Sequence, residues 1–245
     1  MRKCYNILLL LLSSLLIWSC HKAPACDCFD AAGNPTEETR VLPYFEQVHV
    51  NDDINAVITM GNTEQVIIQG GSNLTHNISA TVANNILTLK NNNICNWLRS
   101  YRKSIITVYI TMPRVTYLLN AGSGNIISSD TLTTDSMQVQ TTSAGDITLL
   151  VHCNQILGHM FGPGNVTLSG YSQDFLCTAN GGTGFLYCNN LKTSYTFIST
   201  TTTGDCYVNA SNLLIVDINL RGNVYYVGSP TIESNIKGSG QLIKE

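Results

Sequence analysis

The sequence predicts an all-β protein that folds as a single-stranded solenoid of about seven coils, with about 20 residues in each coil. Two observations predict this fold. Glycines recur at regular steps through the second half of the chain, and short β-branched runs alternate apolar with polar residues. No helical periodicity of useful length is found in the mature chain. A period near 20 without a helix is typical of coils that stack and share one core.

The first 20 residues predict export from the cytoplasm. They read MRKCYNILLLLLSSLLIWSC, in which Arg2 and Lys3 precede an apolar run over residues 7–18. The ending LIWSC resembles the bacterial lipobox, whose cysteine becomes the first mature residue and carries a lipid on its sulfur. The 12-residue apolar run is shorter than the about 20 residues of a spanning helix. We therefore predict a signal peptide over residues 1–19 and lipidation of Cys20; an ordinary signal or an uncleaved anchor helix is the alternative.

The lipid predicts a membrane as the first partner and a bacterial cell envelope location, at the outer membrane, with the periplasmic or the surface side left open. Loss of Arg2 and Lys3 leaves 11 basic against 16 acidic residues, a net charge of −5 in place of −3. This balance argues against nucleic acid and anionic membrane surfaces as partners. The glycine-rich strings lack the strand-to-helix context of a phosphate-binding loop, so neither a nucleotide nor any other cofactor is predicted.

The mature chain is predicted to be one domain on a tether. Residues 20–40 lack apolar periodicity and contain two prolines, so we expect the lipidated cysteine to be followed by a flexible tether. Residues 41–245 are expected to form the domain. Within it, residues 41–117 are irregular strands that cap the solenoid, and residues 118–245 are the repeats.

The repeats are defined by a glycine column with steps of 18 to 21 residues. These corner glycines are Gly124, Gly145, Gly164, Gly184, Gly204, Gly222 and Gly240. A coil corner favours glycine either because it needs a positive φ or because two backbones approach closely. The next residue is mostly an amide or an acid, which suits a turn: Asn125, Asp146, Asn165, Phe185, Asp205, Asn223 and Gln241.

The second residue after each corner glycine is apolar in all seven repeats, which predicts a column that faces the core. Its members are Ile126, Ile147, Val166, Leu186, Cys206, Val224 and Leu242. Strand alternation then sends the following residue outward: Ile127, Thr148, Thr167, Tyr187, Tyr207, Tyr225 and Ile243. The three tyrosines fall on consecutive coils.

We name Phe185, Tyr187, Tyr207 and Tyr225 the aromatic strip, and it is the candidate ligand-contact surface. Sugar rings or apolar peptide side chains can stack on such a surface. The alternative is that the rings only stabilise the sheet by packing on one another.

The run ITVYITMPRVTYLLNAGSGNI (residues 106–126), preceded by VLPYFEQVHV and followed by the glycine repeats, resembles a known family. This is the GIN domain family of Bacteroidetes lipoproteins, described as a putative auto-transporter adhesin head. The resemblance covers about residues 41–240. It implies a right-handed parallel β-helix-like solenoid and an adhesive role, and it supplies no catalytic or binding residues.

Catalytic chemistry is not predicted. Asp146 and Asp205 share an offset but lie three coils apart, about 14 Å, which exceeds the carboxylate separations of glycoside hydrolysis. His152 and Cys153 are adjacent, so a strand projects them to opposite faces. Seven cysteines remain after Cys4 and Cys20, an odd number that leaves any pairing open; Cys26-Asp27-Cys28 lacks a second pair for zinc. We expect the last four, Cys153, Cys177, Cys188 and Cys206, to be buried as small hydrophobes.

Two further features are candidate contact or modification sites. The loop NNNICNWLRSYRKS (residues 91–104) holds the one basic cluster of the mature chain, Arg99, Arg102 and Lys103 beside Trp97 and Tyr101. It is read either as a grip for an acidic group or as a solvated insertion between strands. The strings Asp130-Thr131-Leu132 and Asp135-Ser136-Met137 resemble the Bacteroidetes O-glycosylation acceptor, which makes Thr131 and Ser136 candidate glycosylation sites.

The sequence leaves three functions open. The first is a non-enzymatic binding or adhesion module with a glycan or protein ligand. The second is a structural or assembly protein of the outer membrane, and the third is a carbohydrate-active β-helix enzyme.

Overall fold

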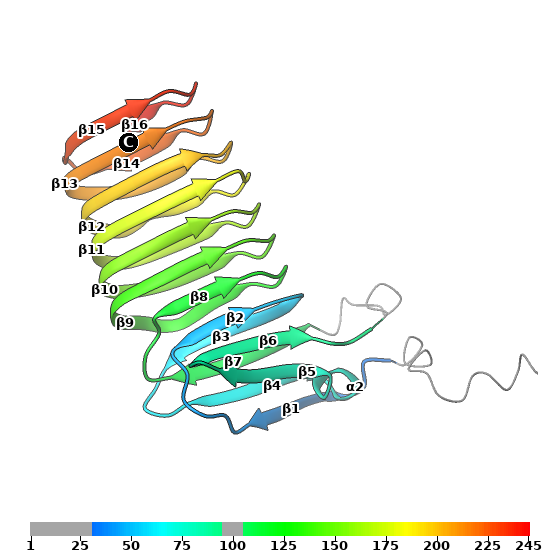
Figure 1. The fold of residues 1–245 in the computed structure, drawn as a ribbon. Coiled ribbons are helices and arrows are strands. Elements are labelled where there is room, and N and C mark those ends of the chain that lie inside the picture. Colours follow the sequence, from blue (N-terminus) through cyan, green and yellow to red (C-terminus); the bar gives the residue numbers. More distant parts are fainter. Residues whose placement is uncertain (1–30, 95–104) are drawn as a thin grey trace, which may run out of the picture.

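The computed structural model describes residues 31–94 and 105–245, which form a stack of coils with one end capped (Figure 1). Strands make up 65% of the chain and helix 2%, with about seven turns of roughly 19 residues each, so the predicted β-solenoid is confirmed. The elements are β1 (Pro35–Arg40), β2 (Gln47–Val50), β3 (Ile54–Met60), β4 (Gln65–Gly71), α2 (Ser72–Thr75), β5 (Ile78–Ala83), β6 (Ile86–Asn91), β7 (Ile106–Met112), β8 (Tyr117–Asn120), β9 (Ile126–Thr141), β10 (Ile147–Met160), β11 (Val166–Asn180), β12 (Leu186–Thr201), β13 (Cys206–Ile218), β14 (Val224–Val227), β15 (Thr231–Ile236) and β16 (Leu242–Lys244).

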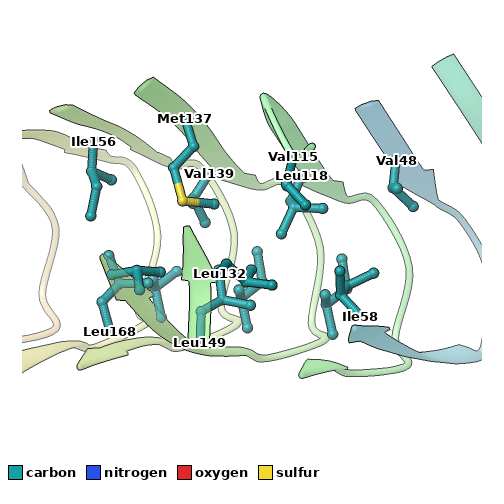
Figure 2. Packing of buried hydrophobic residues seen from close by; sticks show 14 of the residues in the cluster. Val48, Ile58, Val115, Leu118, Leu132, Met137, Val139, Leu149, Ile156 and Leu168 are labelled. Carbon is teal, nitrogen blue, oxygen red and sulfur yellow. The ribbon is translucent and has the colours of Figure 1, made fainter. Parts of the chain in front are cut away.

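Each regular coil is one long strand that crosses two facing sheets. Strands β9 to β13 pair in parallel with their neighbours, and each turns from the first sheet into the second part-way along its length. In β13, residues 206–209 pair with β14, whereas residues 213–218 pair with β15. Buried side chains of the two sheets point toward one another and form the core (Figure 2).

The predicted inward column is confirmed. Six of its seven members are buried, and Leu242 of the last coil packs against the core while half exposed. The column stacks in register, because Ile147 pairs with Ile126 on one side and with Val166 on the other. Burial of this column between the two sheets contributes to the apolar stabilisation of the fold.

Close backbone approach is the reason for the corner glycines. The structure gives a positive φ to four described glycines, Gly33, Gly170, Gly181 and Gly228, and none of the seven corner glycines is among them. A Cβ on Gly164 would instead collide with the carbonyl oxygen of Gly145 in the preceding coil. The same collision recurs from coil to coil along the column. The positive-φ explanation is therefore wrong, and the close-approach explanation is confirmed.

The N-terminal cap contains coil-like turns that are out of chain order. Strand β2 lies between β6 and β8, and β3 lies between β7 and β9, all in parallel. Antiparallel strands then close this end, because β5 pairs with β6 and β4 pairs with β7. Helix α2 buries Leu74 at the same end.

The predicted tether is too long by at least six residues. Residues 35–40 form β1, which pairs antiparallel with β4 from Pro35 to Arg40. The sequence PTEETR has no apolar residues that alternate with polar ones, so no local pattern predicts a strand there. In the structure its residues alternate between exposed and half-buried positions, and none is fully buried. This edge is held by main-chain pairing on a neighbour rather than by core burial.

Several predictions fall outside the described residues. These are the signal peptide, the lipidation of Cys20, the thiols Cys26, Cys28 and Cys95, and the basic cluster with Trp97 and Tyr101. In residues 31–94 and 105–245, no helix has the length and apolar character needed to cross a membrane.

Candidate functional site

The aromatic strip is assembled by the coil register. Tyr187 pairs with Tyr207, and Tyr207 pairs with Tyr225, so β12, β13 and β14 place three rings side by side on the outer face of the first sheet. Phe185 precedes Tyr187 by two residues and lies on the same face. Because the pairing is parallel and in register, each ring stacks on the ring of the next coil.

The four rings form one continuous stack. The centroids of Phe185 and Tyr187 are 5.8 Å apart with 7° between the planes. Tyr187 and Tyr207 are 5.5 Å apart at 17°, and Tyr207 and Tyr225 are 4.8 Å apart at 9°. These values are those of offset stacking, the arrangement that aromatic quadrupoles favour. An offset stack leaves ring edges and part of each ring face open to a ligand.

The strip is open to solvent and carries polar groups. Tyr187 is 38% exposed, and the other three rings are partly exposed. Partial desolvation, followed by the nearby carboxylate of Asp205, raises the pKa of the Tyr207 hydroxyl. The Nδ2 group of Asn223 donates to the Tyr225 hydroxyl at 3.3 Å. The strip therefore offers apolar ring surface and hydroxyl groups on one face.

Beside the strip runs a ladder of side-chain hydrogen bonds, which we call the corner ladder. In it, a polar residue after a corner glycine accepts a hydrogen bond from the backbone N–H of its counterpart one coil later; the acceptors are Asn125, Asp146, Asn165, Asp205 and Asn223. The Oδ1 atom of Asp146 accepts from Asn165 at 2.8 Å, and the Oδ1 atom of Asn165 accepts from Phe185 at 2.9 Å. The ladder resumes where Asp205 accepts from Asn223 at 2.7 Å. Phe185 has no acceptor to offer Asp205, so the ladder is interrupted at the coil where the aromatic strip begins.

Comparison with known proteins places the chain in a family. The family described as "Putative auto-transporter adhesin, head GIN domain" matches residues 44–230. This chain belongs to that family. The resemblance read from residues 106–126 is thereby confirmed. A comparison with curated proteins gave no match.

Solved structures share the GIN domain fold. A putative adhesin from Bacteroides fragilis is 23% identical, with a TM-score of 0.81 over 86% of this chain and 97% of that chain. A putative adhesin from Parabacteroides distasonis is 16% identical, with a TM-score of 0.68 over 87% and 98% of the two chains. A putative lipid binding protein from the same species is 15% identical, with a TM-score of 0.67 over 89% and 99%. At these identities the likeness shows the fold alone.

The other predicted site residues are not brought together into a catalytic group. His152 is exposed and Cys153 is buried, so the two side chains project to opposite sides as predicted. Asp146 and Asp205 both serve the corner ladder three coils apart. Within the described ranges, no group of three or more His, Cys, Asp or Glu side chains is placed to hold a metal ion.

The cysteines and the glycosylation candidates are placed as follows. Within the part of the chain that the structure describes, Cys153, Cys177, Cys188 and Cys206 are buried free thiols, as predicted. Burial raises the pKa of each thiol, to about 12 for Cys206, which makes them poor nucleophiles. Thr131 and Ser136 both lie exposed on β9, where their glycosylation stays a prediction.

A second apolar surface was missed from the sequence. Leu157, Leu176, Phe197 and Ile215 are register partners on the outer face of the second sheet. Leu176 is 38% exposed, and an open groove of about 270 Å³ lies over the last three of these coils. The sequence does contain the pattern, because these four apolar residues recur at steps of 18 to 21 residues, as the corner glycines do. It becomes visible only when the repeats are also compared at this position, about 12 residues after each corner glycine.

Proposed function

We propose that this GIN domain protein is a lipid-anchored, non-enzymatic binding module of the bacterial cell envelope, and that the aromatic strip is its ligand-contact surface. The observation that carries the proposal is the partly exposed stack of four rings on one face of consecutive coils. Membership of an adhesin-described family supports a binding role at the envelope.

The chemistry of the strip favours a glycan ligand. Aromatic rings supply stacking surface for the apolar face of a sugar ring, and the tyrosine hydroxyls supply hydrogen-bond partners for sugar hydroxyls. The chain's net negative charge argues for a neutral glycan over an acidic one. A strip spanning β12 to β14 covers about 10 Å along the solenoid axis, the length of about two sugar units, at ~4.8 Å per coil.

The test is a neutral-glycan array, with a panel of host matrix proteins alongside, probed with wild type and two matched tyrosine variants. Tyr207→Ala removes the ring in the middle of the strip, whereas Tyr195→Ala removes a 46% exposed ring from the second sheet. We expect Tyr207→Ala to abolish glycan binding and Tyr195→Ala to retain it. Melting curves of both variants separate lost binding from lost stability. Binding that survives Tyr207→Ala would exclude the strip as the site, and binding to the protein panel alone would overturn the glycan assignment.

Lipid anchoring has its own test. The lipidated terminus supplies the proposed membrane affinity, so Cys20→Ala should move the mature protein from the membrane fraction to the soluble fraction. Fractionation of the natural host with antibody detection measures this change. Protease shaving of intact cells then distinguishes a surface adhesin, which is cleaved, from a periplasmic assembly protein, which is protected.

A further inference from the structure

A polar pocket lies at the bend where the first long strands pass from one sheet to the other. It is formed by β9, which follows the cap (Figure 1), by β10, and by the segment between β7 and β8. We call it the bend pocket. Its volume is about 460 Å³, within the range of about 300–1,000 Å³ of pockets that hold small ligands, whereas the groove over the second sheet has about 270 Å³.

Polar side chains dominate the lining of the bend pocket. Six of its eight described residues are polar or charged, whereas most small-molecule pockets are mainly apolar. These six are Arg114, Thr133, Thr134, Asp135, His152 and Asn154. Thr133 pairs with His152, and the pairing of β9 with β10 omits Asp135 and Asn154 at the bend. A lining of this kind fits a ligand that makes hydrogen bonds over most of its surface.

The hydrogen-bonding capacity of this lining is largely unused. Among the residues that the structure describes, no protein group forms a hydrogen bond with the side chains of Asp135, His152 and Asn154, which are all exposed. The Nε atom of Arg114 lies 3.8 Å from the Oε2 atom of Glu46, which is too far for a hydrogen bond. These four side chains are therefore available to a ligand.

A buried hydroxyl in the same wall also lacks a partner. The Oγ1 atom of Thr134 is buried and makes no hydrogen bond within the described ranges. Its register counterparts have partners, because Cys153 donates to Ser172 at 3.7 Å and Ser172 donates to the carbonyl oxygen of Asp174 at 2.7 Å. The protein's own groups complete the later bends and leave the first one incomplete.

The mixture of donors and acceptors favours a neutral ligand that is rich in hydroxyl groups. The Arg114 guanidinium only donates hydrogen bonds, the Asp135 carboxylate only accepts them, and the Asn154 amide does both. An anion would be repelled by Asp135, and a cation would be repelled by Arg114. A sugar hydroxyl donates and accepts at once, so a sugar can use both kinds of group.

The rim of the pocket adds aromatic surface. The centroids of the His152 and Tyr171 rings are 5.4 Å apart, and Tyr171, on the next coil, is 38% exposed. One coil is ~4.8 Å, about the length of one sugar unit, so a second unit of a bound glycan would reach the Tyr171 ring. Asp135 is the only acid among the eight described lining residues, and hydrolysis of a glycosidic bond needs two carboxyl groups. The pocket is therefore suited to binding rather than to cleavage.

We propose that the bend pocket is a second carbohydrate site, which binds one unit of a neutral glycan mainly through the hydroxyl groups of the sugar. The aromatic strip offers stacking surface on β12 to β14, whereas the bend pocket offers directed hydrogen bonds on β9 and β10. The second site does not depend on glycan binding by the strip.

The test is an NMR titration of the full chain with the free neutral sugars glucose, galactose, mannose and N-acetylglucosamine, and with glucuronic acid as the charged comparison. The ring signals of His152, assigned with His152→Gln, report on the pocket, and those of His76 beside α2 report on the cap. We expect at least one neutral sugar to shift the His152 signals saturably and to leave the His76 signals in place. The Kd should be millimolar, the affinity that a ligand of about 12 non-hydrogen atoms reaches.

Two matched acid variants locate the bound sugar. Asp135→Ala removes the acceptor in the pocket and should raise the Kd by about fivefold or more. Glu233→Ala removes an exposed acid from β15 and should leave the Kd within about twofold of wild type. Arg114→Ala, on a different segment of the pocket, should weaken binding as Asp135→Ala does. All three side chains are exposed, so unchanged melting temperatures are expected and separate lost binding from lost structure.

Four outcomes would overturn the proposal: no saturable His152 shift with any neutral sugar, a shift with glucuronic acid alone, an unchanged Kd in Asp135→Ala, or an equal loss in Glu233→Ala. Tyr207→Ala separates the two sites, because it should leave the His152 titration unchanged. Loss of the His152 shift in that variant would place the sugar on the strip and exclude the pocket. Failure of the strip to bind a glycan would not alter this titration, so the two proposals are tested separately.

Discussion

Substitution of Gly164 by alanine measures how tightly the coils are stacked. The added Cβ would overlap the carbonyl oxygen of Gly145 and lie 2.9 Å from that of Ser143. Both obstacles are backbone atoms of the preceding coil, so relief requires a shift of one coil against the next. Overpacking of this kind costs about 1–3 kcal/mol. For a domain of this size we expect a melting temperature lower by about 2–12 °C, measured by circular dichroism.

The matched control separates crowding from backbone conformation. Gly181 has a φ of +69° and nothing within 4 Å of its missing Cβ. Asparagine tolerates a positive φ, so Gly181→Asn should leave the melting temperature within about 2 °C of wild type. Gly164→Asn should be at least as destabilising as Gly164→Ala. Our reasoning would be refuted by a Gly164→Ala protein as stable as wild type, or by recovery of stability in Gly164→Asn.

Three further outcomes follow from the same coils. Truncation of the fully buried Ile147 to alanine should lower the unfolding free energy by about 2–5 kcal/mol in urea titrations; a loss below 1 kcal/mol would mean that the coil collapses around the gap. Asp146→Ala deprives the Asn165 N–H of its acceptor and should cost about 1 kcal/mol in the same assay, whereas Asp146→Asn keeps the Oδ1 atom and should cost less. The thiol of Cys206 has a pKa raised from its ordinary value of 9.0 to about 12, so the unfolded chain releases this proton first as pH rises; the corresponding stability is present below about pH 9 and is lost between about pH 9 and 12. Its labelling by a disulfide reagent at pH 8 should require denaturant, and rapid labelling of the folded protein would contradict the assigned burial.

The parts of the fold that repeat were predictable from the sequence. One alignment on the corner glycines is enough to identify the inward column and the outward tyrosines, because a parallel coil puts the same offset at the same place in every turn. Gly164 itself was explained only by the structure. Its φ is ordinary, and the collision that excludes a side chain involves an oxygen contributed 19 residues earlier.

The parts that do not repeat were harder to predict. Strand β1 has no apolar alternation, since it is held by pairing with β4 along one edge. The order of β6, β2 and β8 in the cap depends on long-range pairing that no local pattern encodes. The corner ladder was visible only as turn-compatible residue types, because its hydrogen bonds join residues 18 to 21 positions apart. The aromatic strip could be predicted because its register follows directly from the repeat.

The interruption of the corner ladder at Phe185 has a mechanical consequence. Between β12 and β13 a ladder hydrogen bond is missing and the pairing register shifts twice, whereas β10 and β11 pair without a shift. Among the junctions between the long strands β9 to β13, this one has the most register shifts and no ladder hydrogen bond, so we expect it to open first of these under load. The Tyr187 and Tyr207 rings lie on either side of this junction. A ligand in contact with both rings would hold β12 and β13 together. Tension on the bound ligand would then be transmitted to the coils that precede this junction.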